Sequence, residues 1–519
     1  MPPCPVQVSL RVFNQSRRAL FFPAGSAYRP AMDAPSLHRR PGTPRRLAAT
    51  LVAIWLIVSL LAPPLVQASF FSFDLKDERE LGEKFNIMIR SRMPLIEDTE
   101  INDYVTGVVD RLIKVMPPQP FPFTVGIINN NAVNAFAGPA GYVFVFTGLI
   151  LQMEHESEMA GVLAHELAHV SQRHIAKRVA EMKLLSIGQL VGVLAGVVLG
   201  STTGNQDLGS MVAIGSQAAT AHAYLKYSRD DEREADQVGM NYLVAAGYQP
   251  GGLVEAFETM KKLRWMQGGG VIPTYLSTHP GLEERMGYLK DRIKMLPKDI
   301  QDRKNNDAAF KRAQVLVRAR YTDAKNAVAY FRKLGDKMTC LDKLGLAIAL
   351  SRSLEDVGQA RAAFDEAVAC APNDPLVLRE TGRYYLKVRD FARAKSLLEA
   401  ALRQNPTDID ANFEYGRMLA QEGKPAQAVS YLEKVRLRVP ENAEIRSIYG
   451  QILGQSGDLF HAYLQLTYAA VYENNPPQVK FQLGKAKAAA KTDADRRELA
   501  KLEETIQKRS EFWKKRIME

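Results

Sequence analysis

The sequence is poor in cysteine and histidine, and outside its N-terminal segment it carries little net charge. Its 519 residues contain 3 cysteines and 8 histidines, and the formal net charge is +11. Removing residues 1–68 takes away eight arginines and one aspartate, so 60 Lys and Arg remain against 56 Asp and Glu, a net charge near +4. The rest of the chain lacks the excess of Lys and Arg that is typical of nucleic-acid-binding proteins, so we expect no nucleic-acid partner.

Cysteine is scarce enough that at most one disulfide can form beyond the N-terminal segment. Cys4 lies in that segment, which leaves Cys340 and Cys370. These two residues stand near the start and the end of one expected helical hairpin, and antiparallel helices bring those ends together. A disulfide in an oxidising compartment and two buried free thiols are both compatible with this spacing.

The N-terminus lacks the ~20 consecutive apolar residues of a typical membrane-spanning helix. Four arginines precede an uncharged stretch at 47–62, and small residues follow at Val66 and Ala68. This pattern is typical of a secretory signal peptide over 1–68, cleaved after Ala68, and a single membrane anchor is the alternative. Met32 would begin a signal peptide of more ordinary length, so we expect the true start there.

Although histidine is rare, two histidines stand four residues apart around a glutamate. His165, Glu166 and His169 form the pattern H-E-x-x-H, and the surrounding residues 162–170 are largely apolar and contain neither Gly nor Pro. The pattern predicts a buried helix on which both imidazoles share a face and can bind one metal ion. Glu166 would hold a water molecule and accept its proton. A core helix that carries two histidines by coincidence is the alternative.

A catalytic zinc takes three protein ligands and keeps a fourth position open, so a third ligand must come from elsewhere. Glu232 is the best candidate, within the acidic run 227–239, and Asp236 stands four residues later on the same face of an expected helix. Asp236 would accept the second N–H of a histidine ligand and so fix its tautomer. The alternative is a solvated acidic helix face.

H-E-x-x-H followed by E-x-x-A-D resembles the HtpX-like and CAAX-prenyl-protease-type family of zinc metallopeptidases. The resemblance includes 134–148 and 156–163 and covers about residues 75–290. It implies one zinc ion per chain and peptides as the substrate. The residues to which it assigns roles are the zinc ligands His165, His169 and Glu232, the catalytic base Glu166 and the supporting carboxylate Asp236.

Beyond residue 340 the chain repeats itself with a period of 34 residues. Small residues and prolines keep this spacing in three columns: Gly382, Gly416 and Gly450; Ala360, Ala394, Ala428 and Ala462; Pro372, Pro406 and Pro440. The columns resemble tetratricopeptide repeats, in which small residues lie at tight helix crossings and proline ends each helix pair. Such stacks form a concave surface that binds segments of partners.

The repeats and the motifs together predict the domain boundaries. We expect a metallopeptidase domain over 69–300, a helical linker or degenerate repeat over 301–340, and a repeat domain over 341–519. Leu499, Leu502 and Ile506 indicate a final amphipathic helix that caps the stack.

Between the two zinc motifs, residues 184–200 carry no charge and have glycines in successive G-x-x-x-G register. The two motifs must lie on one side of any membrane, so a span here needs a returning span, and 208–221 is short and polar for one. We therefore expect 184–222 to form a mobile apolar hairpin over the site or on a membrane surface. A spanning hairpin, and with it an integral membrane protease, is the alternative.

Two further segments are candidates for work at the site. Residues 142–146 alternate aromatic side chains with valine and predict a strand, which as an edge strand could pair with a substrate backbone and otherwise is a core strand. His279 follows the glycines 268–270, and a matching S-T-H-P loop lies near the metal in repeat-bearing relatives. It could occupy the open position of zinc, stabilise an oxyanion, or lie in an ordinary helix-capping loop.

The other histidines are expected to be surface or core residues: His155, His174, His222 and His461. His174 stands five residues after His169, which on one helix would place it on a different face.

The sequence therefore predicts an α-rich α+β protein, a zincin (gluzincin) metallopeptidase domain with a small β-sheet followed by an all-α tetratricopeptide superhelix. The resemblance implies a zinc endopeptidase in the periplasm of a Gram-negative bacterium, acting in quality control and assembly of outer-membrane and other envelope proteins. The expected partners are unfolded or misassembled envelope proteins as substrates and the outer-membrane assembly machinery at the repeats. A chaperone-like assembly factor with weak or dormant peptidase activity is the alternative.

Overall fold

A computed structural model describes residues 73–181, 186–194, 227–266, 274–353 and 357–513, and Phe71–Glu519 forms one compact unit. The expected signal peptide, the start at Met32, the glycines 268–270 and most of the expected hairpin 184–222 lie outside the described residues. Within them, we find no helix with both the length and the apolar character that crossing a membrane requires.

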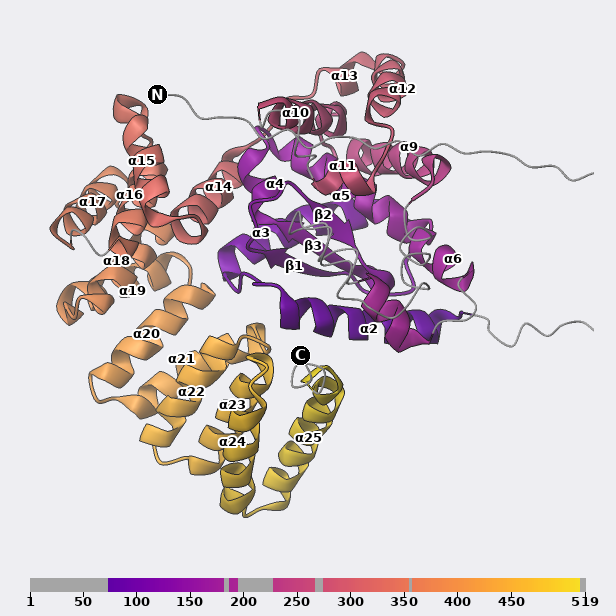
Figure 1. Ribbon diagram of the computed structural model, residues 1–519. Helices are drawn as coiled ribbons and strands as arrows, with labels where there is room; N and C mark the ends of the chain where they lie inside the picture. Colours follow the sequence, from indigo (N-terminus) through magenta and orange to yellow (C-terminus); the bar gives the residue numbers. More distant parts are fainter. Residues whose placement is uncertain (1–72, 182–185, 195–226, 267–273, 354–356, 514–519) are drawn as a thin grey trace, which may run out of the picture. The chain divides into compact units, whose positions relative to one another are not determined.

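The first part of this unit packs helices around a small sheet (Figure 1). Its helices are α2 (Leu75–Arg92), α3 (Thr99–Ile113), α4 (Thr147–Gln152), α5 (Glu156–Ser171), α6 (His174–Glu181), α9 (Arg229–Ala245), α10 (Gly252–Met266), α11 (Thr274–Thr278), α12 (Leu282–Lys294) and α13 (Lys298–Gln301). The strands are β1 (Thr124–Ile128), β2 (Ala135–Ala137) and β3 (Tyr142–Phe146), in the order β1-β3-β2. Strand β3 runs parallel to β1 and antiparallel to β2.

Strand β3 is the central strand of the sheet, so of the two alternatives for residues 142–146 the core strand holds and the edge strand is wrong. Both of its faces are buried. Its two valines join the main core, whereas Phe144 and Phe146 pack against Phe85 of α2. The alternation of aromatic residues and valine therefore reflects two buried faces that pack against different clusters, and the edge strands of the sheet are β1 and β2.

The described part of the expected hairpin belongs to the same aromatic layer. Residues 187–194 are helical, and Leu190, Val191 and Leu194 are buried in the cluster that contains Phe144. These apolar side chains are thus core residues of the described structure.

Two glycines allow α9 and α10 to approach α5 closely. A Cβ atom at Gly239 of α9 would lie 3.0 Å from the backbone nitrogen of His165, and one at Gly161 of α5 would lie 2.5 Å from the backbone nitrogen of Leu253. Larger residues at either position would push the helices apart. The spacing between α5 and α9 sets the distance between the two zinc motifs.

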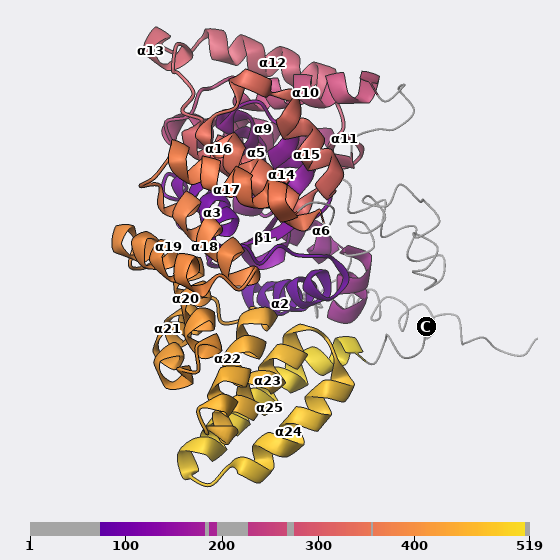
Figure 2. The same cartoon turned by 90° about the vertical axis from the view of Figure 1, so that its left-hand side faces the viewer.

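The second part is a succession of helices stacked from α14 to α25 (Figures 1 and 2). They are α14 (Ala308–Tyr321), α15 (Ala324–Lys333), α16 (Cys340–Arg352), α17 (Val357–Cys370), α18 (Pro375–Lys387), α19 (Phe391–Gln404), α20 (Ile409–Gln421), α21 (Pro425–Arg438), α22 (Ala443–Gln455), α23 (Leu459–Tyr472), α24 (Pro476–Ala489) and α25 (Asp493–Trp513). A Cβ at Gly382 would lie 2.8 Å from Leu398, which explains why the repeat needs glycine at this crossing. The predicted fold class is confirmed.

The stack has two features that the sequence suggested. Cys340 and Cys370 are joined by a disulfide between the start of α16 and the end of α17. In α25, Leu499 and Leu502 are buried and Ile506 packs against the same cluster. The disulfide alternative therefore holds, and the last helix covers the apolar end of the stack.

Polar contacts join the start of α3 to the repeats. Glu100 accepts hydrogen bonds from Arg312 of α14 at 2.5 Å and from Arg379 of α18 at 2.6 Å. Thr99 donates to Asp410 of α20 at 2.6 Å. The domain boundaries at 300 and 340 stay predictions, since α14 and α18 both contact the peptidase part.

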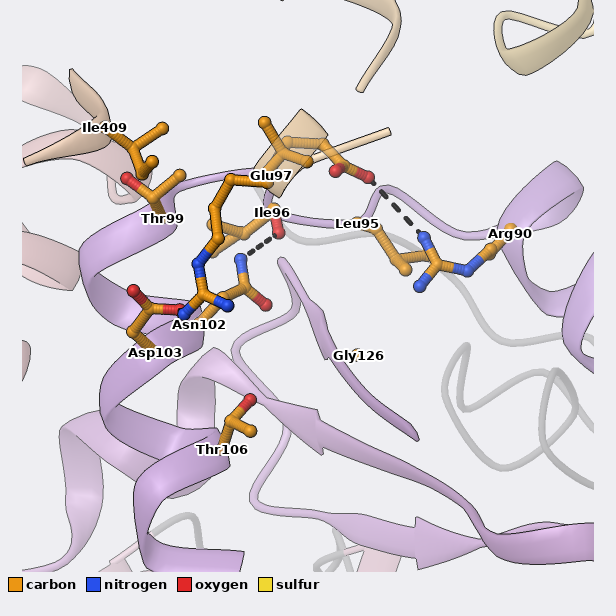
Figure 3. A pocket seen from close by; sticks show the side chains of 12 residues that line it. Arg90, Leu95, Ile96, Glu97, Thr99, Asn102, Asp103, Thr106, Gly126 and Ile409 are labelled. Carbon is orange, nitrogen blue, oxygen red and sulfur yellow. Dashed lines mark hydrogen bonds and ion pairs between the residues drawn. The ribbon is translucent and has the colours of Figure 1, made fainter. Parts of the chain in front are cut away.

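A cavity of about 220 Å³ lies beside this junction. In Figure 3 the Arg90 guanidinium faces the Glu97 carboxylate across 3.6 Å, and the Asn102 amide donates to the Ile96 carbonyl at 2.8 Å. Gly126 of β1 and Ile409 of α20 also line it. The side chains of the two zinc motifs do not line this cavity, so it is not the candidate metal centre.

Candidate metal centre

Helix α5 presents both histidines of H-E-x-x-H to the same point. The helix begins with a capping box at His155 and Glu158 and runs to Ser171. His165 and His169 are fully buried, and their Nε2 atoms lie 3.0 Å apart. Two nitrogen lone pairs therefore converge from one face of one helix.

Helix α9 brings a carboxylate to the same point. It begins with a capping box at Ser228 and packs along α5. The Glu232 carboxylate oxygens lie 3.5 Å from Nε2 of His165 and 3.6 Å from Nε2 of His169. The two motifs, more than sixty residues apart in the sequence, thus face each other.

His279 completes the group. Its Nδ1 lies 2.9 Å from Oε1 of Glu232 and 3.3 Å from Nε2 of His165. One donor atom from each of four buried residues lies within 4.8 Å of the others. The members of this donor set are His165, His169, Glu232 and His279.

Asp236 lies behind the set, on the same helix as Glu232. Its Oδ1 is 2.9 Å from Nδ1 of His165. The Arg285 guanidinium of α12 donates to Asp236 at 2.7 and 2.8 Å, and its third nitrogen is 2.6 Å from Oε2 of Glu232. Tyr288 also donates to Asp236. Arg285 is a functional candidate that the sequence reasoning missed, because nothing in its neighbourhood marks one arginine of a charged helix as buried.

The Glu166 carboxylate links the donor set to the sheet. The backbone N–H of Ala137, in the edge strand β2, donates to Oε2 of Glu166 at 3.1 Å. Nε2 of His279 lies 3.4 Å from Oε1 of the same carboxylate. The general-base candidate therefore lies between β2, an edge strand of the sheet, and the donor set.

Two tyrosines pack against the histidine rings. Tyr275 of α11 stacks on His279 with ring centroids 4.3 Å apart, and Tyr227 stacks on His169 at 3.8 Å. Tyr275 is fully buried. These rings hold the imidazoles in place and exclude water from their faces.

Burial and charge set the protonation of the site. Burial would raise the pKa of Glu232, but His279 and His165 hold it far below its ordinary value. Burial likewise opposes ionisation of Asp236, yet Arg285 and His165 lower its pKa to about 2. Burial lowers the pKa of His169 and raises that of Glu166. The Glu232 carboxylate is thus ionised and His169 is neutral, the forms of these side chains that can bind a metal ion.

The donor set fits a divalent cation. Three carboxyl groups, of Glu166, Glu232 and Asp236, surround it, and one guanidinium faces them. With neutral imidazoles and ionised carboxylates the net charge is therefore −2. Burial and Arg285 disfavour a proton on His165, yet the contacts with Asp236 and Glu232 outweigh them and raise its pKa to about 9. Imidazole nitrogens and carboxylate oxygens are ligands that suit zinc.

His174 is a core residue, one of the two expected alternatives, but the expectation that it lies on a different face from His169 is wrong. Helix α5 ends before it, and α6 begins at His174 itself, so the rule for two positions of one helix does not apply. The buried His174 ring lies against His169, with the two Nδ1 atoms 2.8 Å apart. His155 and His461 make contacts with Asp307 and Asp458 and are partly exposed, as expected. His222 lies outside the described residues.

Two facing helices that bring together two histidines and a glutamate, with a second glutamate beside them, are the arrangement typical of zinc metallopeptidase sites. The model of Peptidase family M48 matches residues 97–293, and that of the Tetratricopeptide repeat matches 385–452. The chain thus carries a domain of the zinc-using peptidase family M48 followed by tetratricopeptide repeats, and the resemblance stated from the motifs is confirmed.

Named relatives are similar to between a third and a half of the chain. The putative beta-barrel assembly-enhancing protease of Vibrio cholerae is 29% identical over 258 residues, 50% of this chain and 52% of that protein. The beta-barrel assembly-enhancing protease of Escherichia coli K12 is 27% identical over 267 residues, 50% and 54%. The metalloprotease YcaL of the same strain is 34% identical over 173 residues, 33% and 63%. The chain spans about half the length of the first two relatives.

Proposed function

We propose that the chain is a zinc-dependent endopeptidase whose metal ion is held by His165, His169 and Glu232. The observation that carries the proposal is the convergence of these three buried side chains, from two helices, on one point. A general-base candidate lies directly beside that point, and an edge strand lies beside the base. The match to an M48 peptidase domain supports the same reaction.

Each residue has a distinct task in this proposal. When bound, zinc polarises the scissile carbonyl and makes a water molecule more acidic. Glu166 accepts the proton of the attacking water and passes it to the leaving amine, a role that suits its raised pKa. Asp236 holds His165 in the tautomer that leaves Nε2 free for the metal, and β2 pairs with the substrate backbone.

His279 acts as a gate. A zinc with four protein ligands has no open position, whereas a catalytic zinc needs one. His279 is a fourth donor within the set and also faces Glu166 at 3.4 Å. Substrate therefore has to displace His279 before catalysis, and basal activity is low.

We further propose that the enzyme acts in the periplasm of a Gram-negative bacterium, in quality control and assembly of outer-membrane proteins. The names of the two similar proteases support this role, as does the secretory signal expected over 1–68. Unfolded or misassembled envelope proteins would be the substrates, and the repeats would bind the outer-membrane assembly machinery.

Digestion of an unfolded outer-membrane β-barrel protein by the full-length chain tests the proposal. We expect cleavage that stops on removal of zinc, returns on its readdition and is absent in Glu166→Gln at equal zinc content. Cleavage that persists in Glu166→Gln, or that ignores metal removal, would refute the assigned site.

The fourth donor also favours a second candidate, a chaperone-like assembly factor with dormant peptidase activity. Under that alternative, His279 rarely leaves the donor set, and the protein acts through binding of other proteins by the repeats. Complementation of a deletion strain separates the two functions. Rescue by Glu166→Gln to the level of the wild type favours the chaperone, and failure to rescue favours the peptidase.

A further inference from the structure

His174 has no task in the proposed reaction, yet it lies against a proposed metal ligand. Arg173, between α5 and α6, adopts a left-handed backbone with φ of 56°. This turn reverses the chain and returns His174 to the side of His169. Their ring centroids are 5.0 Å apart, and His174 is only 1% exposed.

Each ring nitrogen of His174 has a polar partner. Its Nδ1 lies 2.8 Å from Nδ1 of His169, and its Nε2 lies 3.1 Å from Oε2 of Glu234. Of two imidazole nitrogens at this distance, one carries a proton and donates a hydrogen bond, and the other accepts that hydrogen bond. His169 presents Nε2 to the donor set, so its Nδ1 carries the proton and donates a hydrogen bond to Nδ1 of His174. The proton of His174 is then on its Nε2, which donates a hydrogen bond to Glu234.

We propose that His174 is a positioning residue that fixes the tautomer and the ring orientation of His169, and that Glu234 fixes those of His174. The inference rests on the proposed zinc site. Asp236 occupies the same place behind His165, at 2.9 Å from its Nδ1. The two histidine ligands are thus held from behind by different groups, one by a carboxylate and one by an imidazole backed by a carboxylate.

The geometry separates this role from that of a metal ligand. The Nδ1 atom of His174 faces the back of His169, the side away from the donor set. His174 is absent from the donor set, whose atoms lie within 4.8 Å of one another. Its effect on zinc must therefore pass through His169.

Zinc affinity of the full-length chain, measured by competition with a chromogenic chelator, tests the proposal. Leucine at this position fills the space without accepting a hydrogen bond, whereas glutamine offers an amide oxygen. We expect His174→Leu to weaken zinc binding by about 10- to 100-fold and His174→Gln to restore most of it. The matched control is His461→Leu, a histidine 2.8 Å from Asp458 and outside the site, which should bind zinc like the wild type.

Cobalt substitution adds a readout that a merely structural role would not move, because the visible absorption of bound Co²⁺ depends on ligand geometry. We expect a changed spectrum in His174→Leu and a spectrum like that of the wild type in His174→Gln. Wild-type zinc affinity in His174→Leu, or equal losses in the two variants, would overturn the proposal.

Glu234→Gln keeps the proposal testable if His174→Leu does not fold. An amide accepts a weaker hydrogen bond than a carboxylate, so we expect zinc affinity to fall severalfold. Unchanged affinity would contradict the role of this second link. A wild-type chain that binds no zinc would instead refute the proposed function, a result distinct from either outcome.

Discussion

Replacing His279 by alanine should raise basal proteolysis. In the structure His279 contacts the Glu232 carboxylate at 2.9 Å and stacks on Tyr275 at 4.3 Å, and under the proposed gate this is the closed state. A hydrogen bond to a charged group is worth about 1.5–3 kcal/mol, and the aromatic stack adds about 0.5–1.5 kcal/mol. At about 1.4 kcal/mol per factor of ten, loss of the hydrogen bond alone shifts the closed–open equilibrium by about 10- to 140-fold.

The assay compares initial cleavage rates of unfolded outer-membrane protein at matched zinc content. We expect His279→Ala to exceed the wild type by up to that factor. The control His461→Ala, which changes a partly exposed histidine outside the site, should match the wild type. A fall of about 10² or more would refute the gate and assign His279 to oxyanion stabilisation. An unchanged rate would leave His279 with a structural role only.

Three further experiments test other parts of the structure. Alanine at His165, His169 or Glu232 should abolish zinc binding, whereas Glu166→Gln should retain it, as measured by metal analysis. Full zinc content in Glu232→Ala would show that Glu232 is not a zinc ligand. Arg285→Leu leaves two buried carboxylates without their cation. It should therefore destabilise the zinc-free protein by about 3–5 kcal/mol and the zinc-loaded protein by less. Equal losses of stability in thermal unfolding would argue that Arg285 does not serve to balance the charge of these carboxylates. The double variant Cys340→Ser/Cys370→Ser opens a loop of about 30 residues and should lower the free energy of unfolding by about 3–4 kcal/mol in denaturant titration, and no change would mean that the bridge adds no stability.

The sequence predicted the parts of the site that lie on regular helices. The four-residue spacings of His165 and His169, and of Glu232 and Asp236, fix which side chains share a face, because helix geometry is local. The 34-residue period likewise follows from local packing, since each repeat contacts its neighbours.

The parts that the sequence did not predict depend on where the helices end and on long-range contacts. His174 was assigned to another face because the turn at Arg173 carries no glycine or proline to mark it. Residues 142–146 gave a strand but not its place in the sheet, because strand order depends on partners far apart in the sequence. Arg285 lies at the site because α12 packs against α9, a long-range contact that the local sequence pattern does not indicate.

The contacts at the N-terminal end of α5 bear on the boundary expected at residue 300. The backbone N–H of Glu156 donates to Oδ1 of Asp307 at 2.8 Å, and His155 lies 2.6 Å from the other oxygen of the same carboxylate. Asp307 precedes α14, the first helix of the second part, while His165 and His169 lie near the other end of α5. A cut at residue 300 would therefore remove an anchor of the helix that holds two proposed zinc ligands. Recruitment by the repeats is better tested with surface variants of the full-length chain than with a truncated peptidase, because a loss of activity in the fragment would not distinguish missing recruitment from a loosened site.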